Sequence, residues 1–299
     1  MGARLRWGLL VAVAACKAQL SDGPGADATR PPDARAIDAA SNYTGLGAWS
    51  APQTIPGADL GNAANSLDDP TVSSDELELI YSMTLSGGAN SNFYVMTRAT
   101  TADAWGKPSL ITELSSASNE TTPRLSVNDL TLYFNRAGTI YTATRAAIGQ
   151  PWTTIAPLTE VNTGASQKWM SVCNGGYFML SRVITGSTTG NDLYEGQLGT
   201  GPGTLVASLS SAYSDVGSKL SVDCLTLFFA STRADHTNSE IYMTTRATIG
   251  GAWSTPVLVN DFNLAGASQD DPWQSIDQRL FVFSRNSTAI PNALYYSTR

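Results

Sequence analysis

The stretch LSVNDLTLYFNRAGTIYTATR, residues 125–145, carries the pattern that decides the fold. It starts with a polar turn, and an alternating apolar strand follows in which Leu130, Leu132 and Phe134 share one face. After a short Gly-containing loop, a second, aromatic strand ends in Arg145. Alternation with a period of two indicates strands with two distinct faces. No helical period of useful length follows residue 45.

The first half of this pattern occurs five times in the chain. The related segments are VSSDELELIY from Val72, LSVNDLTLYF from Leu125, MSVCNGGYFML from Met170, LSVDCLTLFF from Leu220 and QSIDQRLFVF from Gln274. With Ser73, Ser126, Ser171, Ser221 and Ser275 as equivalent residues, the spacings are 53, 45, 50 and 54 residues. A period of this length is typical of propeller blades.

The second half of the pattern recurs as well. The aromatic strands end in Arg98, Arg145, Arg246 and Arg299, and the elements that contain Trp and Pro hold Trp49, Trp105, Trp152 and Trp253. Because a catalytic residue is needed only once, this repetition indicates framework: we expect each Arg to pair with a carboxylate and each Trp to pack between blades. The unit at 166–204 lacks the Arg, and we expect a distorted blade there.

The two chain ends are complementary. The last unit stops at Arg299 before its Trp-Pro element, while an extra copy, WSAP at 49–52, precedes the first unit. An amino-terminal strand that completes the last blade would close the ring without a free edge. We therefore predict an all-β, five-bladed β-propeller over residues 45–299 with strand-swapped closure.

These units resemble the WD-like propeller repeats of the TolB type, whose pattern is an acidic residue, Pro, Ser-x-Asp, an apolar strand and Ile-Tyr. The best matches are DPTVSSD at 69–75 and DPWQSID at 271–277. The resemblance covers nearly all of residues 45–299. It implies a propeller and says little about activity, because one fold hosts both scaffolds and enzymes.

The amino terminus has the features of an export signal. Arg4 and Arg6 precede an apolar stretch at 7–15 that is too short to span a bilayer. Its end, VAAC at 13–16, resembles the bacterial lipobox, which implies a signal peptide at 1–15 and a lipidated Cys16 that anchors the protein in a membrane. An ordinary signal peptide, cut elsewhere, is the alternative. Residues 16–44, rich in Ala, Asp and Pro, predict a disordered tether, and we expect an outer-membrane or cell-surface location.

Composition excludes several classes of protein. Only 14% of residues are charged and the net charge is −7, so no basic footprint matches a phosphate backbone and we expect no nucleic-acid partner. No apolar run reaches the roughly 18 to 20 residues of a membrane span. His236 is the only histidine, and neither a nucleophile elbow nor a phosphate loop is present. We expect no cofactor, no metal site and no catalytic residue.

Carboxylates and tryptophans are the candidates for ligand binding. The acids that precede the repeat serines are Asp68, Asp69, Glu120, Asp215, Asp270 and Asp271. They are expected to face one mouth of the central channel, where they could bind a cation, a basic peptide end or a sugar; the alternative is that they cap turns. Asp69 and Asp271 lie four residues before their serine, whereas Glu120 and Asp215 lie six before, so the ring is out of register. Trp169 and Trp273 are candidates for stacking on a ligand.

The two remaining cysteines, Cys173 and Cys224, fall at the same turn of adjacent units. Exported proteins meet oxidising conditions, so we expect a disulfide, with two unrelated buried thiols as the alternative.

A complete repeat frame without a catalytic constellation favours a monomeric binding or scaffolding module for an envelope protein or glycan. The competing hypothesis is a glycosidase-like enzyme that uses Asp69, Glu120 and Asp215. It requires these carboxyl groups to converge in one open pocket.

Overall fold

The computed structural model describes residues 46–183, 190–234, 236–287 and 290–299. The proposed signal peptide at 1–15, Cys16 and the tether at 16–44 lie outside these ranges. No helix within the described ranges is long and apolar enough to cross a membrane.

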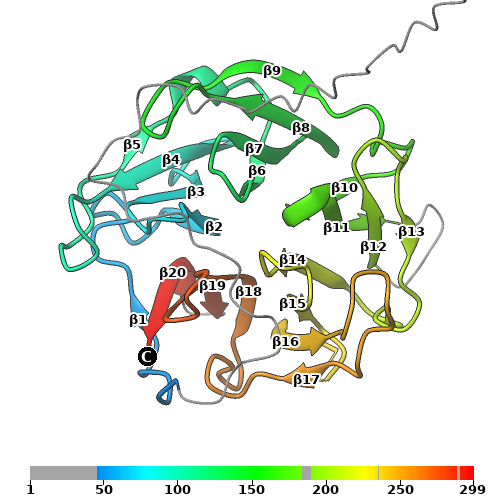
Figure 1. Ribbon diagram of the computed structural model, residues 1–299. Coiled ribbons are helices and arrows are strands. Elements are labelled where there is room, and N and C mark those ends of the chain that lie inside the picture. Colours follow the sequence, from blue (N-terminus) through cyan, green and yellow to red (C-terminus); the bar gives the residue numbers. More distant parts are fainter. Residues whose placement is uncertain (1–45, 184–189, 235, 288–289) are drawn as a thin grey trace, which may run out of the picture. The chain divides into compact units, whose positions relative to one another are not determined.

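Five antiparallel sheets of four strands surround a central channel (Figure 1), which confirms the predicted all-β, five-bladed propeller. The strands of the first two blades are β2 (Ser66–Val72), β3 (Glu78–Thr84), β4 (Ser91–Thr97) and β5 (Ser109–Leu110), then β6 (Glu120–Leu125), β7 (Thr131–Arg136), β8 (Thr139–Thr144) and β9 (Thr153–Pro157). Blades 3 and 4 contain β10 (Gln167–Val172), β11 (Tyr177–Val183), β12 (Asn191–Gln197) and β13 (Thr204–Leu205), then β14 (Asp215–Leu220), β15 (Thr226–Ser231), β16 (Glu240–Thr245) and β17 (Val257–Leu258). Two short 3₁₀ helices, Thr112–Leu114 and Asn174–Gly176, lie between strands.

Blade 5 joins the two ends of the described chain. It contains β18 (Ser268–Gln274), β19 (Leu280–Ser287), β20 (Ile290–Thr298) and the amino-terminal β1 (Gln53–Thr54). Gln53 pairs with Tyr296 and Thr54 with Tyr295, so the predicted strand-swapped closure is present.

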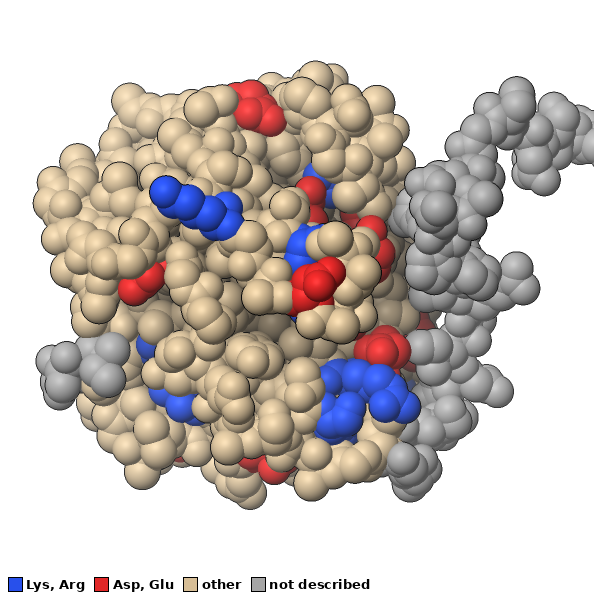
Figure 2. All heavy atoms as spheres, turned by 90° about the vertical axis from the view of Figure 1, so that its left-hand side faces the viewer, with Lys and Arg blue, Asp and Glu red and all other residues tan. Residues whose placement is uncertain are grey.

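The apolar core lies between the blades. Each of five buried clusters takes its side chains from two adjacent blades, as in the cluster that joins Ile80 and Phe93 of blade 1 to Leu132 and Phe134 of blade 2. The apolar faces of the alternating strands are thus buried against a neighbouring blade, which explains why no single blade would be stable alone. On the face that Figure 2 shows, charged groups are few and lie among uncharged atoms.

The repeated Arg and Trp residues form a framework of stacked pairs. The guanidinium carbons of Arg98, Arg145, Arg246 and Arg299 lie 4.2–4.3 Å from the ring centres of Trp105, Trp152, Trp253 and Trp49. Arg145 also pairs with Glu78 of blade 1, and Arg246 with Glu195 of blade 3. Each Arg–Trp pair lies within one blade, whereas the ion pairs of Arg145 and Arg246 connect neighbouring blades.

Blade 3 is not distorted: β10 to β13 form a four-stranded sheet like the others. Its repeat position, however, is occupied by Cys173 rather than Ser171. The backbone N–H of Ser73 donates across the turn to Glu78, and that of Cys173 donates in the same way to Tyr177. The turn of blade 3 is one residue shorter, and Ser171 lies two residues before the position that the repeat serines of the other blades occupy. Ser171 instead accepts a hydrogen bond from the backbone N–H of Leu220 in blade 4.

Candidate functional site

The channel is lined by the innermost strands β2, β6, β10, β14 and β18, each interrupted by a bulge at the same place. At the bulge, one residue of each strand has a positive φ between 52° and 63°. These five residues are Asp69, Thr122, Trp169, Gly217 and Asp271. The bulge turns the strand locally, so that two successive residues approach the channel.

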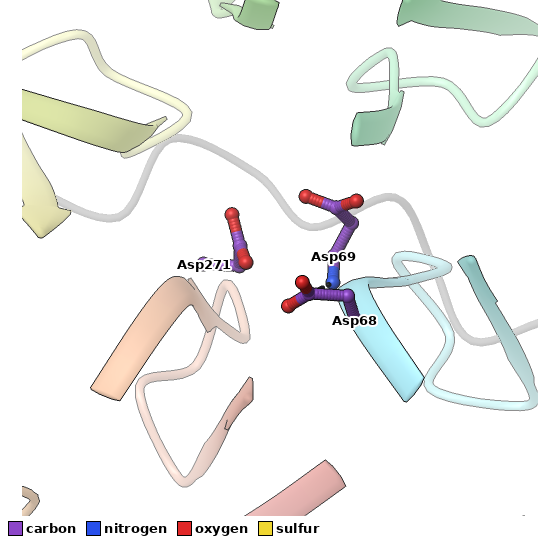
Figure 3. A group of neighbouring side chains, drawn as sticks. All are labelled: Asp68, Asp69 and Asp271. Atoms are coloured by element: carbon purple, nitrogen blue, oxygen red, sulfur yellow. Dashed lines mark hydrogen bonds between the residues drawn. The ribbon is translucent and has the colours of Figure 1, made fainter. Parts of the chain in front are cut away.

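A cluster of carboxyl groups forms where blades 1 and 5 meet. The side chains of Asp68 and Asp69 extend from β2, and that of Asp271 from β18, into the space between the two strands (Figure 3). One carboxyl oxygen from each of the three lies within 4.8 Å of the others. Asp69 and Asp271 are only 4% and 2% exposed. Three of the acids named in the sequence, Asp68, Asp69 and Asp271, are thus brought together.

The carboxylates of Asp68 and Asp69 accept hydrogen bonds from other residues of the protein. Asp69 accepts hydrogen bonds from Ser82 Oγ (2.8 Å), the backbone N–H of Thr122 (3.0 Å) and Trp169 Nε1 (3.1 Å). Asp68 accepts one from Asn292 Nδ2 at 2.8 Å. Asp69 therefore links blade 1 to blades 2 and 3.

One buried cation faces the cluster. Arg124 on β6 is 1% exposed and its Nη2 lies 3.9 Å from Asp271 Oδ1, while its Nη1 donates to the carbonyl of Pro70 at 3.0 Å. Ser284 Oγ donates to the other Asp271 oxygen at 3.2 Å. A single guanidinium cannot neutralise all the carboxyl groups around it.

Burial and mutual repulsion therefore favour the protonated acids. Burial, followed by the charge of Asp69, raises the pKa of Asp68 to about 7. Burial and Asp271 raise the pKa of Asp69 to about 7, and burial raises that of Asp270 to about 6. The pKa of Asp271 lies well above its ordinary value because of burial and the charges of Asp68 and Asp270. Near neutral pH the cluster shares protons among its carboxyl groups.

Carboxylate oxygens are ligands for hard cations such as Ca²⁺ and Mg²⁺. Within the described residues, Asp68, Asp69 and Asp271 are the acidic side chains close enough to share one ion. The adjacent Arg124 opposes a cation there, and hydrogen bonds already occupy Asp69. The geometry suits proton sharing better than metal binding.

Glu120 and Asp215 do not join the cluster, and the proposed triad of Asp69, Glu120 and Asp215 does not form one site. Glu120 is fully buried and pairs with Arg136 of its own blade at 2.8 Å. Asp215, also fully buried, pairs with Arg233 at 2.6 Å. Their offset in the sequence corresponds to another position on the inner strand. Glu120 and Asp215 are the first residues of β6 and β14, two residues before the bulge, and Glu120 lies opposite Arg136 of the next strand in its blade.

The structure joins Cys173 and Cys224 by a disulfide bond between blades 3 and 4. At the equivalent joint between blades 1 and 2, Asp129 accepts hydrogen bonds from the backbone N–H and hydroxyl of Ser74 at 3.0 and 2.6 Å. The same position of the repeat thus links neighbouring blades by different chemistry.

The two tryptophans proposed for stacking lie in different parts of the channel. Trp169 is half-buried, and its indole is tied to Asp69 in the acid cluster. Trp273 is 4% exposed and packs in the apolar cluster between blades 5 and 1, but it also lines a cavity.

That cavity opens at the end of the channel where the repeat turns lie, and all five blades line it. Its volume is about 680 Å³. The last channel-facing residue before each turn is Val72, Leu125, Val172, Leu220 and Gln274, in blade order. Three turn tips add Val127, Val222 and Ile276. A volume of this size suits a small ligand.

Sequence reasoning missed the polar residues of the cavity, Lys219 and Gln274. The available signal was their departure from the repeat: Gln274 stands where the other four units have Val or Leu, and Lys219 is one of only four lysines in the chain.

Comparison with known proteins supports the fold. No family model and no curated protein sequence matches the chain. The structure is similar to an α-L-arabinofuranosidase from Podospora anserina, with 14% identity, a TM-score of 0.56 and coverage of 82% of this chain and 94% of that one. A family 117 glycoside hydrolase from Zobellia galactanivorans has 12% identity, a TM-score of 0.55 and coverage of 84% and 89%. TolB from Acinetobacter baumannii has 15% identity, a TM-score of 0.48 and coverage of 79% and 55%.

Fold and channel together define the class: a five-bladed β-propeller with a carboxyl cluster between the inner strands of blades 1 and 5 and a cavity at the turn end of its channel.

Proposed function

We propose that this chain is a binding module, exported and anchored to an outer membrane or cell surface through lipidated Cys16, that recognises an envelope protein or glycan. The observation that carries the proposal is the cavity of about 680 Å³ lined by all five blades. A rigid ring of blades presents this cavity without the need for any strand to move, and preorganised sites bind at a lower entropic cost. The protein would act as a monomer, since the ring closes on itself.

The test is to fill the mouth of the cavity. Val127 lies on a turn tip and is half-buried, so Val127→Trp places a large ring at the entrance without disturbing the core. Ala165→Trp, in a separate hollow that Thr121, Asn135 and Lys168 also line, is the matched control. Envelope pull-down and a glycan array are run with both variants and the wild type.

A partner or glycan that binds the wild type and Ala165→Trp, but not Val127→Trp, supports the proposal. Binding that survives Val127→Trp places recognition elsewhere and contradicts it. So does the absence of any partner for the wild type.

Glycoside hydrolysis is a second candidate, and the carboxyl cluster is the observation that favours it. With pKa values near 7, one carboxyl group can donate a proton while a neighbour remains a base. Some propellers of this fold are glycoside hydrolases. The test is hydrolysis of a panel of 4-nitrophenyl glycosides: activity that Asp68→Asn abolishes favours the enzyme, and the absence of hydrolysis by the wild type contradicts it.

A further inference from the structure

The floor of the turn-end cavity holds a cation that the protein leaves unpaired. Lys219, on β14, is half-buried, and its ammonium forms no hydrogen bond or ion pair with any residue in the described ranges. Its Nζ lies 5.8 Å from the ring centre of Trp273 on the neighbouring β18. Burial and the nearby charge of Arg124 lower the pKa of Lys219 to about 8, which leaves it mostly protonated at neutral pH.

The two acidic residues that line the cavity are hydrogen-bonded to other residues of the protein. Asp129 binds Ser74 through both carboxylate oxygens, and Asp223 accepts from the hydroxyl of Ser221 and the backbone N–H of Leu225. Neither carboxylate forms an ion pair with Lys219. The charge of Asp129 raises the pKa of Lys219, but neither carboxylate contacts the ammonium, which is therefore open to a carboxylate of a ligand.

A second donor lies beside it. Gln274, at the end of β18, lines the cavity, and its Nε2 is buried without a hydrogen-bond partner. An unsatisfied buried donor costs stability in the free protein. Because the Nε2 group is a hydrogen-bond donor, an acceptor bound next to it would satisfy it. The four other blades place an apolar residue at this position, so the amide is not a requirement of the fold.

The walls indicate what the rest of the ligand must be. Val72, Leu125, Val172 and Leu220 form an apolar ring above the floor, and the indole of Trp273 forms one side. An apolar body suits these walls, whereas an extended polar chain would leave its own polar groups unpaired there.

We propose that the turn-end cavity binds a small carboxylate with an apolar body, its carboxylate on Lys219 Nζ and Gln274 Nε2 and its body against Trp273. This assignment rests on the proposed function and narrows it: the part of an envelope partner that enters the cavity would be a carboxylate with an apolar body, not an extended sugar chain. An ammonium that gains a carboxylate in a partly desolvated site forms a charge-assisted hydrogen bond, which is stronger than a neutral one.

The test uses 3-phenylpropionate and its uncharged analogue 3-phenylpropanamide, titrated into the protein by isothermal calorimetry. We expect the acid to bind at least about tenfold more tightly than the amide. Lys219→Met, which keeps the length of the side chain and removes the charge, should make the two affinities equal. Gln274→Leu, which restores the apolar residue of the other blades, should weaken binding of the acid by about threefold to tenfold.

Lys168→Met is the matched control, because Lys168 lies on the inner strand β10 but outside this cavity. It should bind the acid like the wild type. Thermal unfolding of each variant establishes that it is folded before it is titrated.

Equal affinity of the wild type for acid and amide overturns the carboxylate assignment and leaves the cavity as a binding site. Undiminished binding of the acid to Lys219→Met overturns it as well, and so does failure of the wild type to bind the acid at millimolar concentration. The proposed function itself is decided separately, by the Val127→Trp pull-down.

Discussion

The carboxyl cluster and the turn-end cavity both lie on the inner strands, but their polar groups differ in how far they are hydrogen-bonded within the protein. In the cluster, Asp69 accepts three hydrogen bonds from three different strands, and Arg124 reaches across from the next blade. In the cavity, Lys219 and the Nε2 of Gln274 have no hydrogen-bond or ion-pair partner within the described ranges.

This difference distinguishes framework from recognition. A polar group that bonds a neighbouring blade contributes to closure of the ring, and its removal should cost stability. A buried donor without a partner lowers the stability of the free protein, and it forms a hydrogen bond only when a ligand supplies an acceptor. Substitutions at the joints and in the cluster should therefore alter unfolding, whereas substitutions in the cavity should alter binding.

The largest effect on unfolding is expected at the rim of the cavity, where a disulfide replaces the hydrogen bonds of the equivalent joint. Cys173 and Cys224 are 51 residues apart in the chain, so the double variant Cys173→Ser/Cys224→Ser should lower the free energy of unfolding by about 3–4 kcal/mol. Urea denaturation measures it. The wild type kept under reducing conditions is the control and should match the variant; an unchanged midpoint in both would contradict a bond that constrains the unfolded chain.

The second-largest loss of stability is expected for Glu120→Gln, because this substitution leaves Arg136 without its carboxylate partner. Since Glu120 is fully buried and Arg136 is 19% exposed at its side chain, we expect a loss of about 2 kcal/mol, below the usual figure for a fully buried pair. Urea denaturation checks the loss, and calorimetry with 3-phenylpropionate should show unchanged affinity. A loss of binding without a loss of stability would make Glu120 part of a ligand site.

The substitution Asp68→Asn should raise the free energy of unfolding rather than lower it, by an amount that depends on pH. The Asp68 carboxyl has a pKa of about 7 in the folded protein but an ordinary value of 3.8, so the wild type loses stability as the pH rises from about 4 to about 7. The asparagine does not ionise. The variant should therefore be more stable than the wild type at pH 8, by about 1–2 kcal/mol, and closest to it at pH 4.

Thermal unfolding at both pH values measures this difference. Asp261→Asn, at an exposed residue, is the control and should change stability equally at both. A uniform effect of Asp68→Asn would contradict a raised pKa at this carboxyl.

The smallest effect is expected for Trp169→Phe. It removes one of the three hydrogen bonds to Asp69 and should cost about 1 kcal/mol in denaturant unfolding. Affinity for 3-phenylpropionate should not change. If affinity falls in this variant, the ligand reaches the acid cluster.

Much of the fold could be predicted because the same turn and strand pattern recurs in five segments of the chain. Alternation in segments such as 130–134 fixes which faces of the strands are buried, and the displaced copy at 49–52 indicates how the ring closes. The register of blade 3 could not be predicted from serine alone, since Cys173 occupies the repeat position and the turn is shorter by one residue.

The candidate site was predictable only in part. Asp69 and Asp271 match the repeat pattern, and their blades are neighbours once the ring closes. Glu120 and Asp215 looked equivalent in chemistry, but they lie two residues before the bulge position that Asp69 and Asp271 occupy, and there each pairs with an arginine of its own blade. The cavity depends on what five separate turns enclose, and no single segment contains that information.

The most direct test of recognition at the turn end is the indole N–H spectrum of ¹⁵N-labelled protein during titration with 3-phenylpropionate. The seven tryptophans report on both regions at once, since Trp273 lines the cavity and Trp169 lies in the acid cluster. We predict that the Trp273 resonance shifts with ligand concentration while that of Trp169 stays in place. A shift of Trp169 with Trp273 unchanged, or no shift of either, would contradict binding in the turn-end cavity.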